Sequence, residues 1–193
     1  PGKSSTIPII AITGTNGKTT TTRLIDHIFK LAGNTVGMCT TEGVYIKNRM
    51  IYQGDMTGPM SHKMVLTDPT IDLAVLECAR GGILRAGLGF KTCDVGVVTN
   101  VSEDHLGLRG IHTVDQLARV KSIIPEIVKQ GGVTVLNADD DLVSAMSEKT
   151  KGKIIYFSLD WKNNATVSNH LKEGGIAVVF DDGWLCLMKG QWK

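Results

Sequence analysis

The sequence lacks several features that mark whole classes of protein. None of its apolar runs approaches the length that crosses a bilayer, and its first residues contain no apolar signal-peptide core. Cys39, Cys78, Cys93 and Cys186 are scattered without Cys-x-x-Cys spacing, which predicts neither a zinc site nor a disulfide framework. The net charge is +2 and no basic cluster stands out, so we expect no nucleic-acid partner and no membrane contact. These absences favour a reducing, cytoplasmic location.

What the sequence does contain is the composition of a globular chain. It has 193 residues, of which 42% are hydrophobic and 21% charged, which allows one domain with a substantial core and argues against disorder. There are no internal repeats or low-complexity tracts. The chain begins at Pro1 and ends at Lys193 without a closing signal, so we expect residues 1–193 to be one domain of a longer protein.

One stretch, from Ile9 to Thr20, has the order of a phosphate-binding loop. An apolar strand pattern leads into a glycine turn, then Lys-Thr, then a helical pattern. Glycines let the backbone bend around phosphates, and a helix N-terminus offers unpaired N–H groups to an anion. A lysine there reaches the β- and γ-phosphates, and the next hydroxyl ligates Mg²⁺. The residues expected to contact nucleotide are Gly14, Thr15, Asn16, Gly17, Lys18, Thr19 and Thr20.

The spacing departs from the common phosphate-loop pattern. That pattern places glycine five residues before Gly17, where this chain has Ile12. The alternative is a glycine turn followed by an incidental lysine. The strand before the turn and the helix after it favour a nucleotide site.

Apolar strands alternate with helices along most of the chain, which predicts an α/β fold: a mostly parallel sheet with helices on both faces. We place helix one at 18–31, with Leu24, Ile28 and Leu31 on one apolar stripe. The stretch from 81 to 89 is turn-rich, and short strands split by turns form small hairpin additions at the C-terminal end. The other helices are expected at 60–67, 113–129 and 139–149, and the strands at 7–13, 36–40, 44–46, 50–52, 71–77, 95–99, 133–136, 154–157, 176–180 and 184–188.

Polar residues that follow these strands are the candidates for chemistry, because ligands of parallel sheets lie at the carboxyl ends of the strands. Glu77 closes an apolar strand and reads as a Mg²⁺ ligand, or alternatively as a solvated acid. His105, in the polar run from Asn100, can bind a second Mg²⁺ or orient a phosphate, unless it is simply solvated. Lys121 reads first as part of a solvated helix face. After Asn137, the acids Asp139 and Asp140 read as helix caps.

In their order along the chain these motifs resemble the central ATPase domain of the Mur ligase superfamily. The resemblance covers residues from about 7 to 142. It implies ATP and Mg²⁺ as cofactors, and it makes Lys121 the candidate for the lysine that many Mur ligases carbamylate. The roles it implies are catalytic for Lys18, His105 and Lys121, metal-binding for Thr19, Glu77 and His105, and adenine contact for Asn137.

A closer resemblance extends over nearly the whole chain. The runs 54–59, 76–85 and 104–107 look like the Mur-ligase-like portion of cyanophycin synthetases. That resemblance implies an ATP-dependent ligase that works through an acyl phosphate and adds arginine to aspartate side-chain carboxylates of a polymer. It also implies an ATP-grasp region before residues 1–193, a C-terminal ligase domain after them and a possible homo-oligomer. Arg80 and Arg85 can meet the polyanionic aspartate backbone, or can be ordinary surface arginines.

Other functions share part of this pattern. A phosphate-loop kinase or nucleotide switch needs Lys18 and Thr19 but not the run from Asn100 to His105. Another amino-acid ligase of the superfamily, such as a folylpolyglutamate-synthase-like enzyme, would use a different amine. A third possibility is a core that binds ATP without catalysis, and we expect the 193 residues alone to be inactive.

Overall fold

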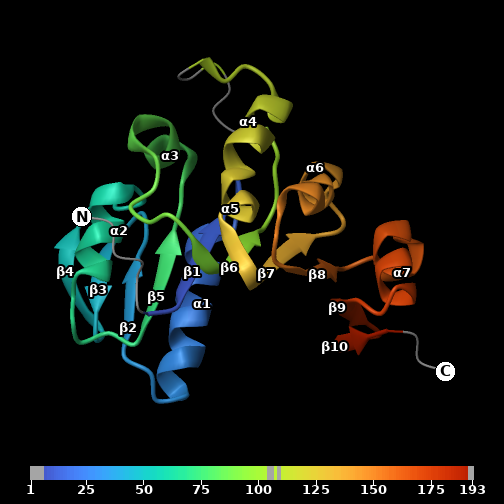
Figure 1. Ribbon diagram of the computed structural model, residues 1–193, viewed down its shortest axis with the longest axis horizontal. Coiled ribbons are helices and arrows are strands. Elements are labelled where there is room, and N and C mark those ends of the chain that lie inside the picture. Colours follow the sequence, from blue (N-terminus) through green and yellow to red (C-terminus); the bar gives the residue numbers. More distant parts are fainter. Residues whose placement is uncertain (1–6, 104–106, 108–109, 191–193) are drawn as a thin grey trace.

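A sheet of ten strands forms the centre of the structure, a computed structural model that describes residues 7–103, 107 and 110–190. The strands lie in the order β10-β9-β8-β7-β6-β1-β5-β2-β3-β4, seen from right to left in Figure 1. Their bounds are β1 Ile9–Thr13, β2 Val36–Cys39, β3 Gly43–Ile46, β4 Arg49–Gln53, β5 Leu73–Glu77, β6 Cys93–Val98, β7 Val128–Asn137, β8 Lys153–Ser158, β9 Ile176–Asp181 and β10 Trp184–Lys189.

Helices connect most of these strands. Their bounds are α1 Lys18–Leu31, α2 Pro59–Leu66, α3 Arg80–Ala86, α4 Val114–Lys121, α5 Ile123–Glu126, α6 Asp141–Ser144 and α7 Ala165–Lys172, with 3₁₀ turns at Ala145–Lys149 and Trp161–Asn163. No helix in the described part of the chain is both long and apolar enough to span a membrane.

The sheet is parallel except at its two ends, which confirms the predicted fold class. In sheet order, the strands from β9 to β2 run parallel to one another. β10 is antiparallel to β9, β3 is antiparallel to β2, and β4 is antiparallel to β3. Both predicted hairpins are present, and Lys47 and Asn48 take the positive φ angles that a tight hairpin turn requires. β1 lies between β5 and β6, because the chain goes from β1 to β2 on one side of it and later crosses from β5 to β6 on the other. A ligand site is expected at the carboxyl end of such a strand.

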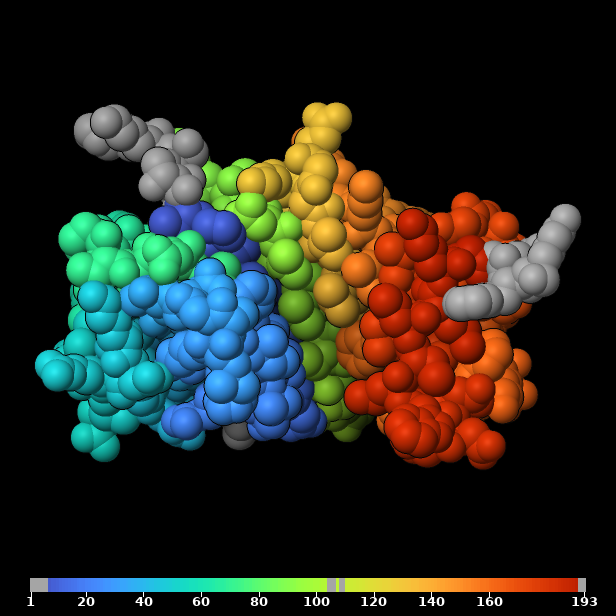
Figure 2. Space-filling model, turned by 90° about the horizontal axis from the view of Figure 1, so that it is seen from below, coloured from blue at the N-terminus to red at the C-terminus, as the bar shows by residue number. Residues whose placement is uncertain are grey.

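Helices cover the two faces of the sheet unequally. Ile10 and Ile12 point toward α1 and pack with its Ile25 and Phe29. The residues of β1 that alternate with these face the opposite layer of helices. In that layer α2, α3 and α5 pack over one half of the sheet, and α4, α6 and α7 pack over the other half. Figure 2 shows the α1 side, with the blue atoms nearer the middle, cyan atoms at one end and the red atoms of the C-terminal strands toward the other.

Two predicted segments were wrong, and one helix was not predicted. Residues 113–129 are not one helix, because Pro125 lacks an N–H and its ring clashes with the carbonyl one turn earlier, so α4 ends at Lys121 and β7 begins at Val128. The turn-rich stretch contains α3, where Gly82 allows the helix to approach Thr57 closely. α7 was missed altogether. Its N-cap is Asn164, and it provides the crossover that parallel strands β8 and β9 need.

Candidate phosphate-loop site

The loop between β1 and α1 has the backbone shape that its glycines allow. Gly17 has φ +82° and serves as the N-cap of α1, leaving the first N–H groups of the helix without a side-chain cap. Gly14 has φ +150°, and a Cβ at that position would lie 1.8 Å from the Thr99 hydroxyl oxygen. The loop is therefore fitted against the segment that follows β6.

The segment that follows β6 holds the phosphate loop through hydrogen bonds to the main chain of the loop. The Asn100 side chain accepts a hydrogen bond from the Asn16 N–H (2.9 Å) and donates one to the Asn16 carbonyl (3.1 Å). The Thr15 N–H donates to the Asn100 carbonyl (2.8 Å), and the Thr15 hydroxyl accepts from the Ser102 N–H (3.1 Å). The side chains of Thr15 and Asn100 thus shape the loop, and the strand-end position of Asn100 was the only sign of this in the sequence.

Two lysines lie against the loop from different elements. The Lys18 ammonium donates to the Thr15 carbonyl at 2.7 Å. The Lys121 ammonium, on α4, donates to the Gly14 carbonyl at 2.7 Å, and this side chain is only 2% exposed. Lys121 therefore does not belong to a solvated helix face. Its charge is buried directly behind the predicted phosphate site.

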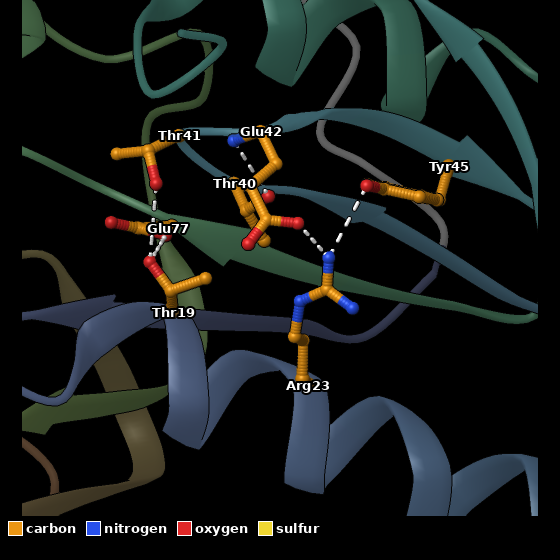
Figure 3. Close-up of polar contacts among 7 residues, drawn as sticks. All are labelled: Thr19, Arg23, Thr40, Thr41, Glu42, Tyr45 and Glu77. Carbon is orange, nitrogen blue, oxygen red and sulfur yellow. Dashed lines mark hydrogen bonds and ion pairs between the residues drawn. The ribbon is translucent and has the colours of Figure 1, made fainter. Parts of the chain in front are cut away.

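Thr19 and Glu77 meet beside the loop, as the sequence predicted. The Thr19 hydroxyl donates to Glu77 Oε2 at 2.8 Å, and the Thr41 hydroxyl lies 3.3 Å from the Thr19 hydroxyl (Figure 3). Thr41 follows β2, and nothing in the local sequence pattern sets it apart. It comes close only because β2 and β1 flank β5 in the sheet.

Glu77 is a buried carboxylate with an unsatisfied atom. It is fully shielded from solvent, and its Oε1 has no hydrogen-bond partner among the described residues. Burial raises the pKa of the Glu77 carboxyl, against the lowering effect of the Thr19 hydroxyl and the nearby Lys18 charge. One carboxylate with a free oxygen and two hydroxyls are oxygen donors of the kind that Mg²⁺ binds, so these residues fit the metal that the resemblance implies.

A second set of contacts fixes the turn that carries Thr41. Arg23, one turn along α1 from Thr19, forms an ion pair with Glu42 and donates to the Tyr45 hydroxyl at 3.3 Å (Figure 3). The Thr40 hydroxyl accepts from the Glu42 N–H at 3.1 Å. The turn after β2 is thereby held against the start of α1.

Comparison with known proteins agrees with this geometry. The family model described as the Mur ligase middle domain matches residues 12–185. The chain belongs to the Mur ligase middle domain family. A cyanophycin synthetase from Synechocystis sp. (strain ATCC 27184 / PCC 6803 / Kazusa) is 54% identical over 191 residues, which are 99% of this chain and 22% of that protein. This middle domain therefore spans about a fifth of the length of the cyanophycin synthetases that it matches.

Solved structures show the same fold. A UDP-N-acetylmuramoyl-L-alanyl-D-glutamate–2,6-diaminopimelate ligase aligns over 91% of this chain and 34% of its own, with a TM-score of 0.71 and 25% identity. A bifunctional folylpolyglutamate synthase/dihydrofolate synthase, solved with Mn, AMPPNP and L-glutamate bound, aligns over 78% of this chain and 43% of its own. Its TM-score is 0.60 and its identity 21%.

The remaining predicted residues differ in where they lie and in what they bind. Asn137 donates to the Thr99 carbonyl at 3.0 Å and accepts from the Asp139 N–H, at the same edge as the loop. Asp140 caps α6 by accepting from the Val143 N–H, as predicted, whereas Asp139 accepts from the Leu159 N–H instead. Asp104 and His105 lie outside the described residues. Within the described part no three His, Cys, Asp or Glu residues cluster as a metal site.

A cavity of about 350 Å³ lies between α3 and the loop before α2. It contains an acid, Asp55, whose charge reaches Glu77 and opposes ionisation of that carboxyl, and a base, Arg85. The sequence had singled out Arg85 but not Asp55. The cavity is lined by Asp55, Met56, Thr57, Gly58, Pro59, Met60, Ser61, Gly82, Arg85 and Ala86.

Proposed function

We propose that this middle domain is the nucleotide-binding core of an ATP-dependent amide ligase that works through an acyl phosphate. The observation that carries the proposal is the contact between Thr19 and Glu77 beside the phosphate loop, with Glu77 Oε1 buried and unsatisfied. A buried carboxylate oxygen without a partner is costly, and a cation would remove that cost. ATP and Mg²⁺ are the cofactors proposed.

The first step of the reaction brings together two anions, the acceptor carboxylate and the γ-phosphate of ATP. An acceptor carboxylate attacks the γ-phosphate and ADP leaves; an amine then displaces phosphate from the acyl phosphate to give the amide. Mg²⁺, when bound, supplies positive charge that neutralises the β- and γ-phosphates. The protein's task is to hold the reacting groups in line and to offset their repulsion.

The chain's own residues divide this task. The N–H groups between Gly14 and Thr20 receive the phosphates, and Lys18 exchanges its contact with the Thr15 carbonyl for the β- and γ-oxygens. Lys121 holds the Gly14 carbonyl from behind, which keeps the loop in its bent form. The metal would be held by Thr19, Glu77 and Thr41 and a second one by His105, and Asn137 would contact adenine.

The substrates follow from similarity and from the cavity. Identity of 54% to a cyanophycin synthetase supports the addition of arginine to aspartate side-chain carboxylates of a polymer. The cavity between α3 and the loop before α2 suits a chain end with both charges, because Arg85 can receive a carboxylate and Asp55 a guanidinium. We also propose a cytoplasmic protein whose full-length form contains the neighbouring domains and can assemble as a homo-oligomer.

A ligation assay on the full-length protein tests the proposal. Purified protein, ATP, Mg²⁺ and an aspartate-backbone primer are supplied with arginine, lysine or glutamate, and amide product, ADP and phosphate are measured. We expect Lys18→Ala to reduce turnover by at least about 10²-fold, the scale of losing one transition-state contact. Lys151→Ala, an exposed lysine in the turn before β8, is the control and should leave turnover unchanged.

The outcome separates the candidate functions. Arginine-dependent amide formation supports the proposal, and product formed only with glutamate supports the folylpolyglutamate-type alternative. Phosphate transferred to a hydroxyl acceptor supports a kinase. Full activity of Lys18→Ala contradicts a catalytic role for the loop.

A further inference from the structure

His62 lies on α2 and is buried against the main chain of Glu77. Its side chain is completely shielded from solvent. Nδ1 accepts a hydrogen bond from the Gly89 N–H at 3.1 Å, and Nε2 lies 3.3 Å from the Glu77 main-chain carbonyl. A backbone N–H is always a donor, so Nδ1 is an acceptor and the proton of the neutral ring is on Nε2. Nε2–H therefore donates to the Glu77 carbonyl.

The ring has little freedom to leave this arrangement. The Cys78 sulfur lies 3.8 Å from Nε2, and the Phe90 ring packs at a centroid distance of 5.2 Å. Gly89 is pressed against α2, since a Cβ there would come within 2.6 Å of both the His62 Cβ and the Pro59 carbonyl oxygen. Burial lowers the pKa of His62 to about 4, so the ring is neutral at pH 7 and keeps this tautomer.

This contact acts on the last residue of β5, which is where accurate placement matters. The Glu77 carboxylate must reach Thr19 on one side and a metal on the other. Glu77 is the last residue of β5, and the next residue, Cys78, is held by β1 through its N–H, which donates to the Ile12 carbonyl at 2.8 Å. The His62 ring holds the Glu77 carbonyl from the α2 side. Groups that orient a ligand from behind commonly change metal affinity when they are removed.

We propose that His62 is a positioning residue that fixes the main chain at Glu77 and so aims the Glu77 carboxylate at the metal. The inference rests on the metal-binding role proposed for Glu77. It adds a residue that touches neither nucleotide nor metal, carried by the helix whose first turn lines the cavity.

Two amide variants separate the two hydrogen bonds. Asparagine places its oxygen where Nδ1 lies, so His62→Asn keeps the bond from Gly89 and loses the bond to Glu77. Glutamine places its N–H group where Nε2 lies, so His62→Gln keeps the bond to Glu77 and loses the other. In the full-length protein we expect His62→Asn to raise the Mg²⁺ concentration for half-maximal ligation about tenfold. His62→Gln should stay within about twofold of the wild type.

Equal effects of the two variants, in either direction, would overturn the proposal, because they would mean that the ring only fills space. Should His62→Asn fail to fold, ¹⁵N NMR of the wild-type imidazole gives an independent test. A proton on Nε2 and a bare Nδ1 support the proposal, and the opposite tautomer refutes it.

A Glu77→Gln variant distinguishes this failure from failure of the proposed function. If the Mg²⁺ requirement is unchanged in Glu77→Gln, the metal role of Glu77 is wrong. If Glu77→Gln abolishes ligation while His62→Asn behaves as the wild type, only the role of His62 is wrong.

Discussion

At the scale of single residues, the phosphate-loop edge combines one charged oxygen donor with neutral ones. Glu77 is the buried carboxylate, and Thr19 and Thr41 contribute hydroxyl oxygens within 3.3 Å of one another. Magnesium bound with ATP needs few protein charges, because the phosphates and bound waters supply most of its oxygen ligands. The small number of acids at this site is therefore consistent with a nucleotide-bound metal.

Thr41 provides a test of that ligand set. Thr41→Ala removes the hydroxyl that lies 3.3 Å from the Thr19 hydroxyl and leaves the main chain in place. We expect the Mg²⁺ concentration for half-maximal ligation to rise about tenfold, with Thr41→Ser close to the wild type. A Mg²⁺ titration of ligation by the full-length protein measures both, and an unchanged requirement in Thr41→Ala would remove Thr41 from the site.

At the scale of helices and strands, the chain shows what local pattern can and cannot determine. The start of α1 was predicted because Gly17 ends the turn and Lys18 begins the helix. The orientation of α1 was not, since Leu24, Ile28 and Leu31 form an apolar stripe at helical spacing but are 57%, 60% and 77% exposed. Ile25 and Phe29 have the same spacing and face the sheet. A pattern with two apolar stripes does not say which one the sheet covers.

Two isoleucines one turn apart test this orientation. Ile25→Ala removes a side chain packed on the sheet and should lower the free energy of unfolding by about 2 kcal/mol. Ile28→Ala removes an exposed side chain and should change it by less than about 0.5 kcal/mol. Urea unfolding measures both, and a larger loss for Ile28 would mean that α1 is turned the other way.

At the scale of the whole molecule, the site exists because parallel strands end at one edge. Glu77, Asn100 and Asn137 follow or close separate strands, and their positions at strand ends made them predictable. The contacts of His62, Thr41 and Lys121 were not predictable, because each depends on which elements become neighbours in the finished sheet. The order β6-β1-β5-β2 brings those elements around the phosphate loop.

The central claim, activation of a carboxylate by the ATP held at this edge, is tested most directly by following oxygen. The full-length protein is given ATP, Mg²⁺, arginine and a primer whose terminal aspartate side-chain carboxylate carries ¹⁸O, and the phosphate released is analysed by mass spectrometry. The account predicts that each amide formed transfers one ¹⁸O atom to inorganic phosphate, through the acyl phosphate. Amide formation with unlabelled phosphate, or with ¹⁸O in AMP, would contradict it.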